Sequence, residues 1–214
     1  MAAWTRRELL AWSAAAAVTG GRAGAHQAPL DQLPPNLPVP QDDGGCRHLV
    51  GMRLPDLALP STRHRPVNLS TVTARRLVVY AYPMTGRPGV TLPAGWDQIP
   101  GARGCTLETC GFRDHHADLA TLQTEVLGVS TQTTEYQQEM VERLKVPFEV
   151  LSDARFALVD ALRLPTFTVE GMRLIKRLTI VAEAGRITHV FYPVFPPDRH
   201  AEDVIAWLRA HPAA

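Results

Sequence analysis

The stretch RLVVYAY, residues 76–82, decides the fold because it is typical of a buried strand. Its β-branched and aromatic side chains favour a strand, and Pro83 ends it. Strands of the same kind are predicted downstream, at residues 125–130, 148–151, 167–169, 172–174, 178–182 and 187–192. The last two are joined through Ala184-Gly185, which predicts a hairpin.

Helices are predicted between these strands. They cover residues 105 to about 122, residues 133–145, and a short segment after Asp153 that carries Phe156, Val159 and Leu162. Residues 133–145 place Tyr136, Met140, Val141 and Leu144 on one face, and a closing helix carries Ala201, Val204, Ile205 and Leu208 at helical spacing. The order predicts an α/β fold whose mixed central sheet, a parallel half followed by an antiparallel hairpin, is flanked by helices.

Length and charge narrow the function classes. A chain of 214 residues can bury one sizeable core with appendages. Its 22 basic and 21 acidic residues give a net charge of +1, which disfavours nucleic-acid binding. Three cysteines, Cys46, Cys105 and Cys110, are too few to staple a small secreted scaffold, so we look for chemistry instead.

The first 25 residues differ in character from the rest. Arg6 and Arg7 precede an Ala-rich apolar run, residues 9–18, and the small residues 23–25 follow. This pattern predicts a cleavable export signal of the twin-arginine type, and the run is too short for stable membrane insertion. An exposed amphipathic helix in a cytoplasmic protein stays open as the alternative. Residues 26–47 are rich in proline and predict an extended linker or wrapping arm ahead of the main domain, residues 48–211.

Cys105 lies between a long loop and a predicted helix. Residues 84–104 contain three prolines and five glycines, which disfavours regular structure. At the first turn of a helix, unpaired N–H groups and the helix dipole favour a thiolate, and Arg103 adds a nearby positive charge. Cys105 is therefore the candidate nucleophile, whereas Cys46 is expected to be a small buried side chain.

Cys110 follows five positions after Cys105 on the same predicted helix. An ideal helix would separate the two Cα atoms by roughly 8–9 Å and turn the side chains about 140° apart. A disulfide tolerates only about 7 Å. If these cysteines pair, the first turn or two of the helix must unwind, and Gly111 lowers the cost.

The segment GCTLETCGFRD, residues 104–114, resembles the active-site helix of the peroxiredoxins, in particular the bacterioferritin-comigratory-protein or PrxQ-like branch. The segments LGVST at 127–131, LSD at 151–153, LTIVAEAGRI behind Arg177 and HVFYP follow in that family's order. The resemblance spans roughly residues 48–210 and implies a thioredoxin-like fold.

By this resemblance, Cys105 is the peroxidatic cysteine that attacks hydrogen peroxide or an organic hydroperoxide and becomes a sulfenic acid. Cys110 is the resolving cysteine, which forms an intramolecular disulfide that thioredoxin or a similar dithiol reduces. Arg177 matches the arginine that holds the thiolate and the peroxide. The resemblance implies no cofactor and no metal, and a monomer or weak dimer.

One spacing departs from the family pattern. Gln98 and Ala102 stand where the family has a proline and a threonine or serine ahead of the peroxidatic cysteine. Pro83 and Thr85 follow the first strand where that loop should begin, which indicates a long insertion between Thr85 and Cys105. We therefore expect Thr85 to supply the hydroxyl ligand, and Pro83 and Arg103 to contact the substrate.

Other functions remain open at this point. Copper handling would use the cysteines with His115 and His116, but neither histidine lies at the i, i+4 spacing from Cys110 that suits a ligand pair. A general disulfide oxidoreductase usually carries a C-x-x-C motif, in which two residues separate the cysteines. A binding domain could retain the fold without any catalytic chemistry.

Overall fold

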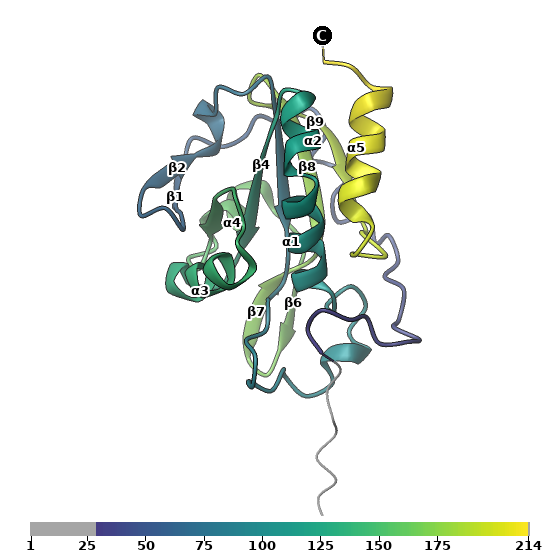
Figure 1. Cartoon of the computed structure of the whole chain (residues 1–214). Helices are drawn as coiled ribbons and strands as arrows, with labels where there is room; N and C mark the ends of the chain where they lie inside the picture. The colour runs from purple at the N-terminus through teal and green to yellow at the C-terminus, as the bar shows by residue number, and fades with distance from the viewer. Residues whose placement is uncertain (1–28, 214) are drawn as a thin grey trace, which may run out of the picture.

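A mixed five-stranded sheet forms the centre of the protein, whose computed structural model describes residues 29–213 (Figure 1). The strand order is β5-β4-β3-β8-β9, with bounds Val150–Ser152, Thr124–Ser130, Arg76–Ala81, Leu178–Glu183 and Arg186–Phe191. Strands β3, β4 and β5 are parallel, β8 is antiparallel to β3, and β9 is antiparallel to β8. The predicted fold class is confirmed, and the hairpin turn lies at Ala184-Gly185, both with positive φ.

Strand β3 lies at the centre of the sheet, between β4 and β8, and all six of its residues are buried. Helices cover both faces of the sheet: α1 (Cys105–Asp114), α2 (His116–Thr121), α3 (Thr134–Leu144), α4 (Ala157–Leu162) and α5 (His200–Ala210). Tyr80 and Tyr82 point to a face packed by side chains of α1, α2, α3 and α5. The opposite face packs against α4 and a small hairpin, β1 (Ala58–Pro60) and β2 (Pro66–Asn68), whose short strands the sequence did not predict.

The helix predicted from Cys105 to about Leu122 is two helices. The chain leaves helical geometry at His115, whose ring nitrogen Nδ1 lies 2.9 Å from the Asp118 carboxylate in the first turn of α2. Residue 115 is thus the joint between α1 and α2, and the predicted single helix was wrong there.

The buried face of α3 agrees with the prediction for Met140, Val141 and Leu144, which pack in one core cluster, and differs from it at two other positions. Gln137 and Met140 are its buried residues, whereas Tyr136 is partly exposed and lies under the Arg87 guanidinium, 4.0 Å from the ring centre. The Gln137 amide is satisfied inside the protein, because it accepts from the Tyr82 hydroxyl and donates to the carbonyl of Leu151. A polar residue can therefore replace an apolar one at this position.

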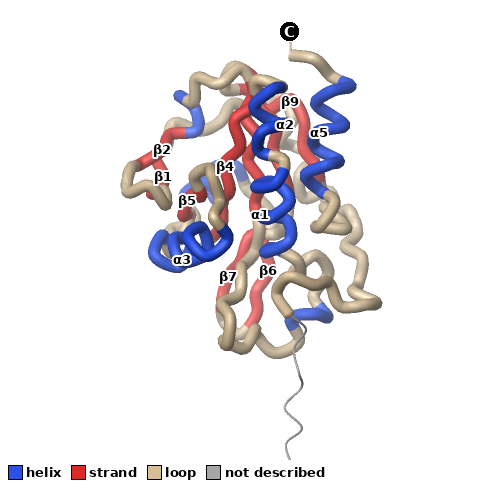
Figure 2. The backbone as a smooth tube through the Cα atoms, viewed as in Figure 1, coloured by secondary structure: helices blue, strands red, loops and turns tan. Residues whose placement is uncertain are grey.

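The long loop before Cys105 packs beside a separate hairpin, β6 (Thr166–Val169) and β7 (Met172–Ile175), as Figure 2 shows. A short 3-10 helix, Trp96–Gln98, interrupts the loop, and Leu92, Trp96 and Ala102 form a third apolar cluster with Val169 and Leu174. The loop thus covers the β6–β7 hairpin through this cluster.

Upstream of the sheet, the described part of the lead-in wraps the body. Asp43 accepts hydrogen bonds from Lys176, at 2.6 Å, and from the Tyr192 hydroxyl, at 2.8 Å.

The predicted export signal, residues 1–25, lies outside the described residues and stays a prediction. Among residues 29–213, no helix combines the length and the apolar character needed to cross a membrane.

Candidate active site

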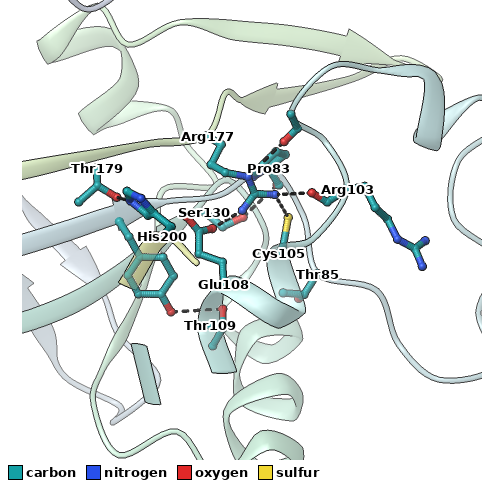
Figure 3. A network of polar contacts seen from close by, with 12 residues as sticks. Pro83, Thr85, Arg103, Cys105, Glu108, Thr109, Ser130, Arg177, Thr179 and His200 are labelled. Carbon is teal, nitrogen blue, oxygen red and sulfur yellow. Dashed lines mark hydrogen bonds and ion pairs between the residues drawn. The ribbon is translucent and has the colours of Figure 1, made fainter. Parts of the chain in front are cut away.

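Cys105 is the first residue of α1 and only 3% exposed, at the edge where β3 ends (Figure 3). Ala81, the last residue of β3, pairs with Leu178, the first of β8. This register brings the residues that follow β3 beside Arg177, which precedes β8. Gly104 caps α1 with φ +101°, and a Cβ there would lie 2.3 Å from Pro197 Cγ, so both conformation and space require glycine.

Arg177 is bound directly to the cysteine. Its Nη2 donates to the Cys105 sulfur at 3.1 Å and to the carbonyls of Ala102 and Arg103 at 3.2 and 3.1 Å. Its Nε donates to the Gly101 carbonyl at 3.2 Å, and its Nη1 pairs with Glu108. Because the loop carbonyls and Glu108 fix the guanidinium, a positive charge is held against the sulfur before any substrate arrives.

The electrostatics of Cys105 depend on that cation. Burial raises the pKa of Cys105 above its ordinary value, while the Arg177 charge and a hydrogen bond from the Met84 backbone N–H lower it. The net shift is upward, contrary to the expectation from the helix N-terminus alone, because desolvation of a fully enclosed sulfur disfavours the thiolate. The thiol donates to the Ala102 carbonyl at 3.4 Å. Arg177 is therefore the largest contribution that favours the thiolate against this burial.

Glu108 is a site residue that the sequence analysis missed. It is fully buried, and one carboxylate oxygen, Oε1, has no hydrogen-bond partner among the described residues. Burial raises the pKa of Glu108 to about 7 even though Arg177 lowers it. Its position three residues after Cys105, on the same side of the helix, was the available signal.

Cys105 and Cys110 are both free thiols on one continuous helix, α1. An intact helix holds their Cα atoms beyond disulfide reach, as the sequence predicts. Cys110 is half-buried; burial raises its pKa, and the Arg113 charge opposes this shift. Gly111 packs on α5, where a Cβ would lie 3.4 Å from that of Ala201. Any unwinding must therefore involve the turns before Gly111.

The segment after β3 reaches the site through its backbone. The Met84 N–H bonds the sulfur, the Pro83 carbonyl accepts from the Ser130 hydroxyl at 3.2 Å, and Thr85 is fully buried nearby (Figure 3). The Thr85 hydroxyl donates to the Gln132 side chain at 3.2 Å. Its oxygen retains lone pairs, so a role for Thr85 as an acceptor from peroxide stays a prediction.

The Arg103 side chain points in a different direction from the one expected for a substrate contact. Its carbonyl binds Arg177, but its guanidinium turns away from the sulfur (Figure 3) and donates to the Pro29 carbonyl at 2.7 Å. It also pairs with Asp97 at 3.5 Å. In this structure the Arg103 guanidinium does not face the Cys105 sulfur, and its contact with the substrate stays a prediction.

The residues weighed for copper are engaged elsewhere. His115 pairs with Asp118, and the His116 ring lies 5.7 Å from that of Phe148. Within residues 29–213, no three histidine, cysteine or acidic side chains gather in a metal-binding group. Cys46 is buried in the core as predicted.

Comparison with known proteins agrees with this geometry. The redoxin family model matches residues 49–205. The chain is 29% identical to peroxiredoxin Bcp of Escherichia coli K12 over 73% of this chain and 93% of the relative. It is 28% identical to peroxiredoxin Bcp of Bacillus subtilis 168, over 72% and 90%. Peroxidoxin BcpB of Mycobacterium tuberculosis superposes with a TM-score of 0.62 at 26% identity, covering 76% of this chain and 97% of that one.

These similarities confirm the resemblance drawn from residues 104–114, and they support a peroxidase over a copper-handling protein or a general disulfide oxidoreductase. The chain belongs to the redoxin family, within its Bcp and PrxQ group of peroxiredoxins.

Proposed function

We propose that this chain is a thiol-dependent peroxidase that reduces hydrogen peroxide and organic hydroperoxides through Cys105. The Cys105 thiolate attacks one peroxide oxygen; an S–O bond forms, the O–O bond breaks, and water or an alcohol leaves after protonation. The observation that carries this proposal is the Arg177 guanidinium, whose Nη2 lies 3.1 Å from the sulfur and which three loop carbonyls hold in place. A fixed cation at this place stabilises the thiolate and the charge that develops on the peroxide.

Resolution then uses Cys110. Its thiolate attacks the sulfur of the Cys105 sulfenic acid, an S–S bond forms, the S–O bond breaks, and water leaves. The first turns of α1 must unwind for this step, because both cysteines lie on one helix in the reduced protein. A thioredoxin-type dithiol reduces the disulfide and restores both thiols.

The proposal extends to assembly. Both redox cysteines belong to one chain, so the cycle requires no cysteine from a second subunit. We therefore propose a monomer or weak dimer, with sedimentation of the reduced and oxidised protein as the test. A stable higher oligomer in both states would contradict it.

Mass spectrometry of the reduced protein treated with one equivalent of hydrogen peroxide tests the chemistry. The wild type should lose two hydrogens and yield a peptide that links Cys105 to Cys110. Cys110→Ser should instead carry one added oxygen on Cys105, Cys105→Ser should do neither, and Cys46→Ser should behave as the wild type. Slow oxidation of all three cysteines without selectivity would contradict the proposed function.

A further inference from the structure

The described part of the lead-in lies directly over the active-site loop. We define residues 29–40 as the N-terminal arm. Arg103, whose side chain is 4% exposed, donates from Nη2 to the Pro29 carbonyl at 2.7 Å. Further along, Leu33 approaches Gly104, where a Cβ would lie 3.0 Å from Leu33 Cδ2. The arm is thus fastened to the two residues that immediately precede Cys105.

Leu30, in the N-terminal arm, covers this part of the site. It packs with the apolar cluster of Leu92, Trp96 and Ala102. A Cβ on Gly86 would lie 2.7 Å from Leu30 Cδ2 and 3.1 Å from Leu92 Cδ2. The two leucines therefore meet above the backbone of Gly86, and glycine is the residue that allows them to do so.

Cys105 lines a small pocket that Leu30 helps to enclose. The other lining side chains include Leu30, Met84, Leu92, Trp96 and Arg103, and the pocket holds about 10 Å³. That volume suits roughly one water molecule. Hydrogen peroxide is only slightly larger than water, whereas the organic group of a bulky hydroperoxide requires the apolar wall to move.

The arm is an addition to the family domain. The redoxin match begins at residue 49, so Leu30 and the carbonyl of Pro29 come from sequence that precedes it. Arg103 belongs to the long loop between Thr85 and Cys105, and it joins the two additions through its bonds to Pro29 and Asp97. Most of the wall of the pocket therefore comes from segments outside the core sheet and helices, and the first turn of α1 supplies the rest.

We propose that the N-terminal arm selects among peroxides: Leu30, positioned by the Arg103 bond to Pro29, closes the Cys105 pocket against bulky organic hydroperoxides. This inference rests on the proposed peroxidase function and deepens it. Arg103 is a positioning residue here, because it acts on the pocket through the arm. The expected consequence is a preference for small peroxides that weakens when the arm is loosened or its leucine is shortened.

The test compares kcat/KM for cumene hydroperoxide with kcat/KM for hydrogen peroxide in the full chain. Leu30→Ala should raise this ratio about tenfold, the scale on which a few methylene groups alter discrimination in an apolar pocket. Leu30→Met, which keeps the side-chain volume, should leave the ratio near that of the wild type. Leu57→Ala is the matched control, since Leu57 is a partly buried leucine packed on the other face of the sheet.

Arg103→Gln distinguishes two roles of Arg103, namely holding the N-terminal arm in place and binding the substrate directly. If Arg103 acts by fastening the arm, the ratio rises as in Leu30→Ala, and the double variant shows less than the product of the two effects. A ratio unchanged in Leu30→Ala, or an Arg103→Gln variant that loses activity equally toward both peroxides, would overturn the inference. Failure of the peroxidase proposal itself has a different signature: a Cys105→Ser variant that still consumes both peroxides.

Discussion

Replacing Arg177 with glutamine tests how the site makes a thiolate. The substitution removes the positive charge 3.1 Å from the Cys105 sulfur while keeping a polar side chain. Glu108 loses its ion pair at the same time. Because Arg177 lowers the pKa of Glu108, its loss raises that pKa further, and the carboxyl becomes neutral around pH 7.

The magnitude follows from the contact distance. A unit charge at 3.1 Å from the thiolate is worth about 5 kcal/mol at an effective dielectric constant near 20. Neutralising Glu108 offsets part of this loss, since its charge raises the pKa of Cys105. We therefore expect a further upward shift of about 1–3 pKa units, which lowers the thiolate fraction at neutral pH by roughly 10- to 1,000-fold.

The assay is alkylation of Cys105 by iodoacetamide across pH, in a background that carries Cys46→Ser and Cys110→Ser. The inflection should move to higher pH in Arg177→Gln, and Arg177→Lys should recover part of the shift because it restores charge without the planar fork. Arg76→Gln is the matched control. Arg76 is also buried and ion-paired, 2.8 Å from Glu183, but at the opposite end of β3.

The reasoning is refuted if Arg177→Gln and Arg76→Gln lower the melting temperature similarly while both leave the alkylation inflection unchanged. Arg177 would then hold the loop carbonyls without tuning the thiol. Peroxide consumption measured on the single variants, with Cys110 present, should fall in parallel with the thiolate fraction for Arg177→Gln alone.

Three further results are expected. Thr85→Val should lower kcat/KM for hydrogen peroxide about tenfold if its hydroxyl contacts substrate, and an unchanged rate removes Thr85 from the site. Burial lowers the pKa of His200 to about 3, so the unfolded state takes up its proton first as pH falls. Wild-type unfolding free energy, measured in urea, should therefore drop by about 2–3 kcal/mol more than that of His200→Gln between pH 6.5 and 4.5, and equal drops would contradict this. Disulfide formation should increase amide hydrogen exchange in residues 30–36, because Leu33 contacts the glycine that must move with Cys105; identical exchange in both states would argue against unwinding there.

The sequence by itself determined the sheet and the redox helix. The alternation of apolar runs and helical faces predicted β3, β4, the β8–β9 hairpin and α5, because periodicity reports which faces are buried. The five-residue spacing of Cys105 and Cys110 depends only on local helix geometry, so the conflict with a disulfide was visible in advance. Where local geometry broke, at His115, the prediction failed because side-chain bonding to Asp118 has no periodic signature.

Only the tertiary structure decided the chemistry of the sulfur. Arg177 lies 72 residues from Cys105, and the β3–β8 register is what brings it into contact. The upward pKa shift of Cys105 results from burial by all its neighbours together, a sum that no single motif contains. The loop before Cys105 and the N-terminal arm lack any period, since proline and glycine dominate them, so the bond between Arg103 and Pro29 emerges only when the chain is folded.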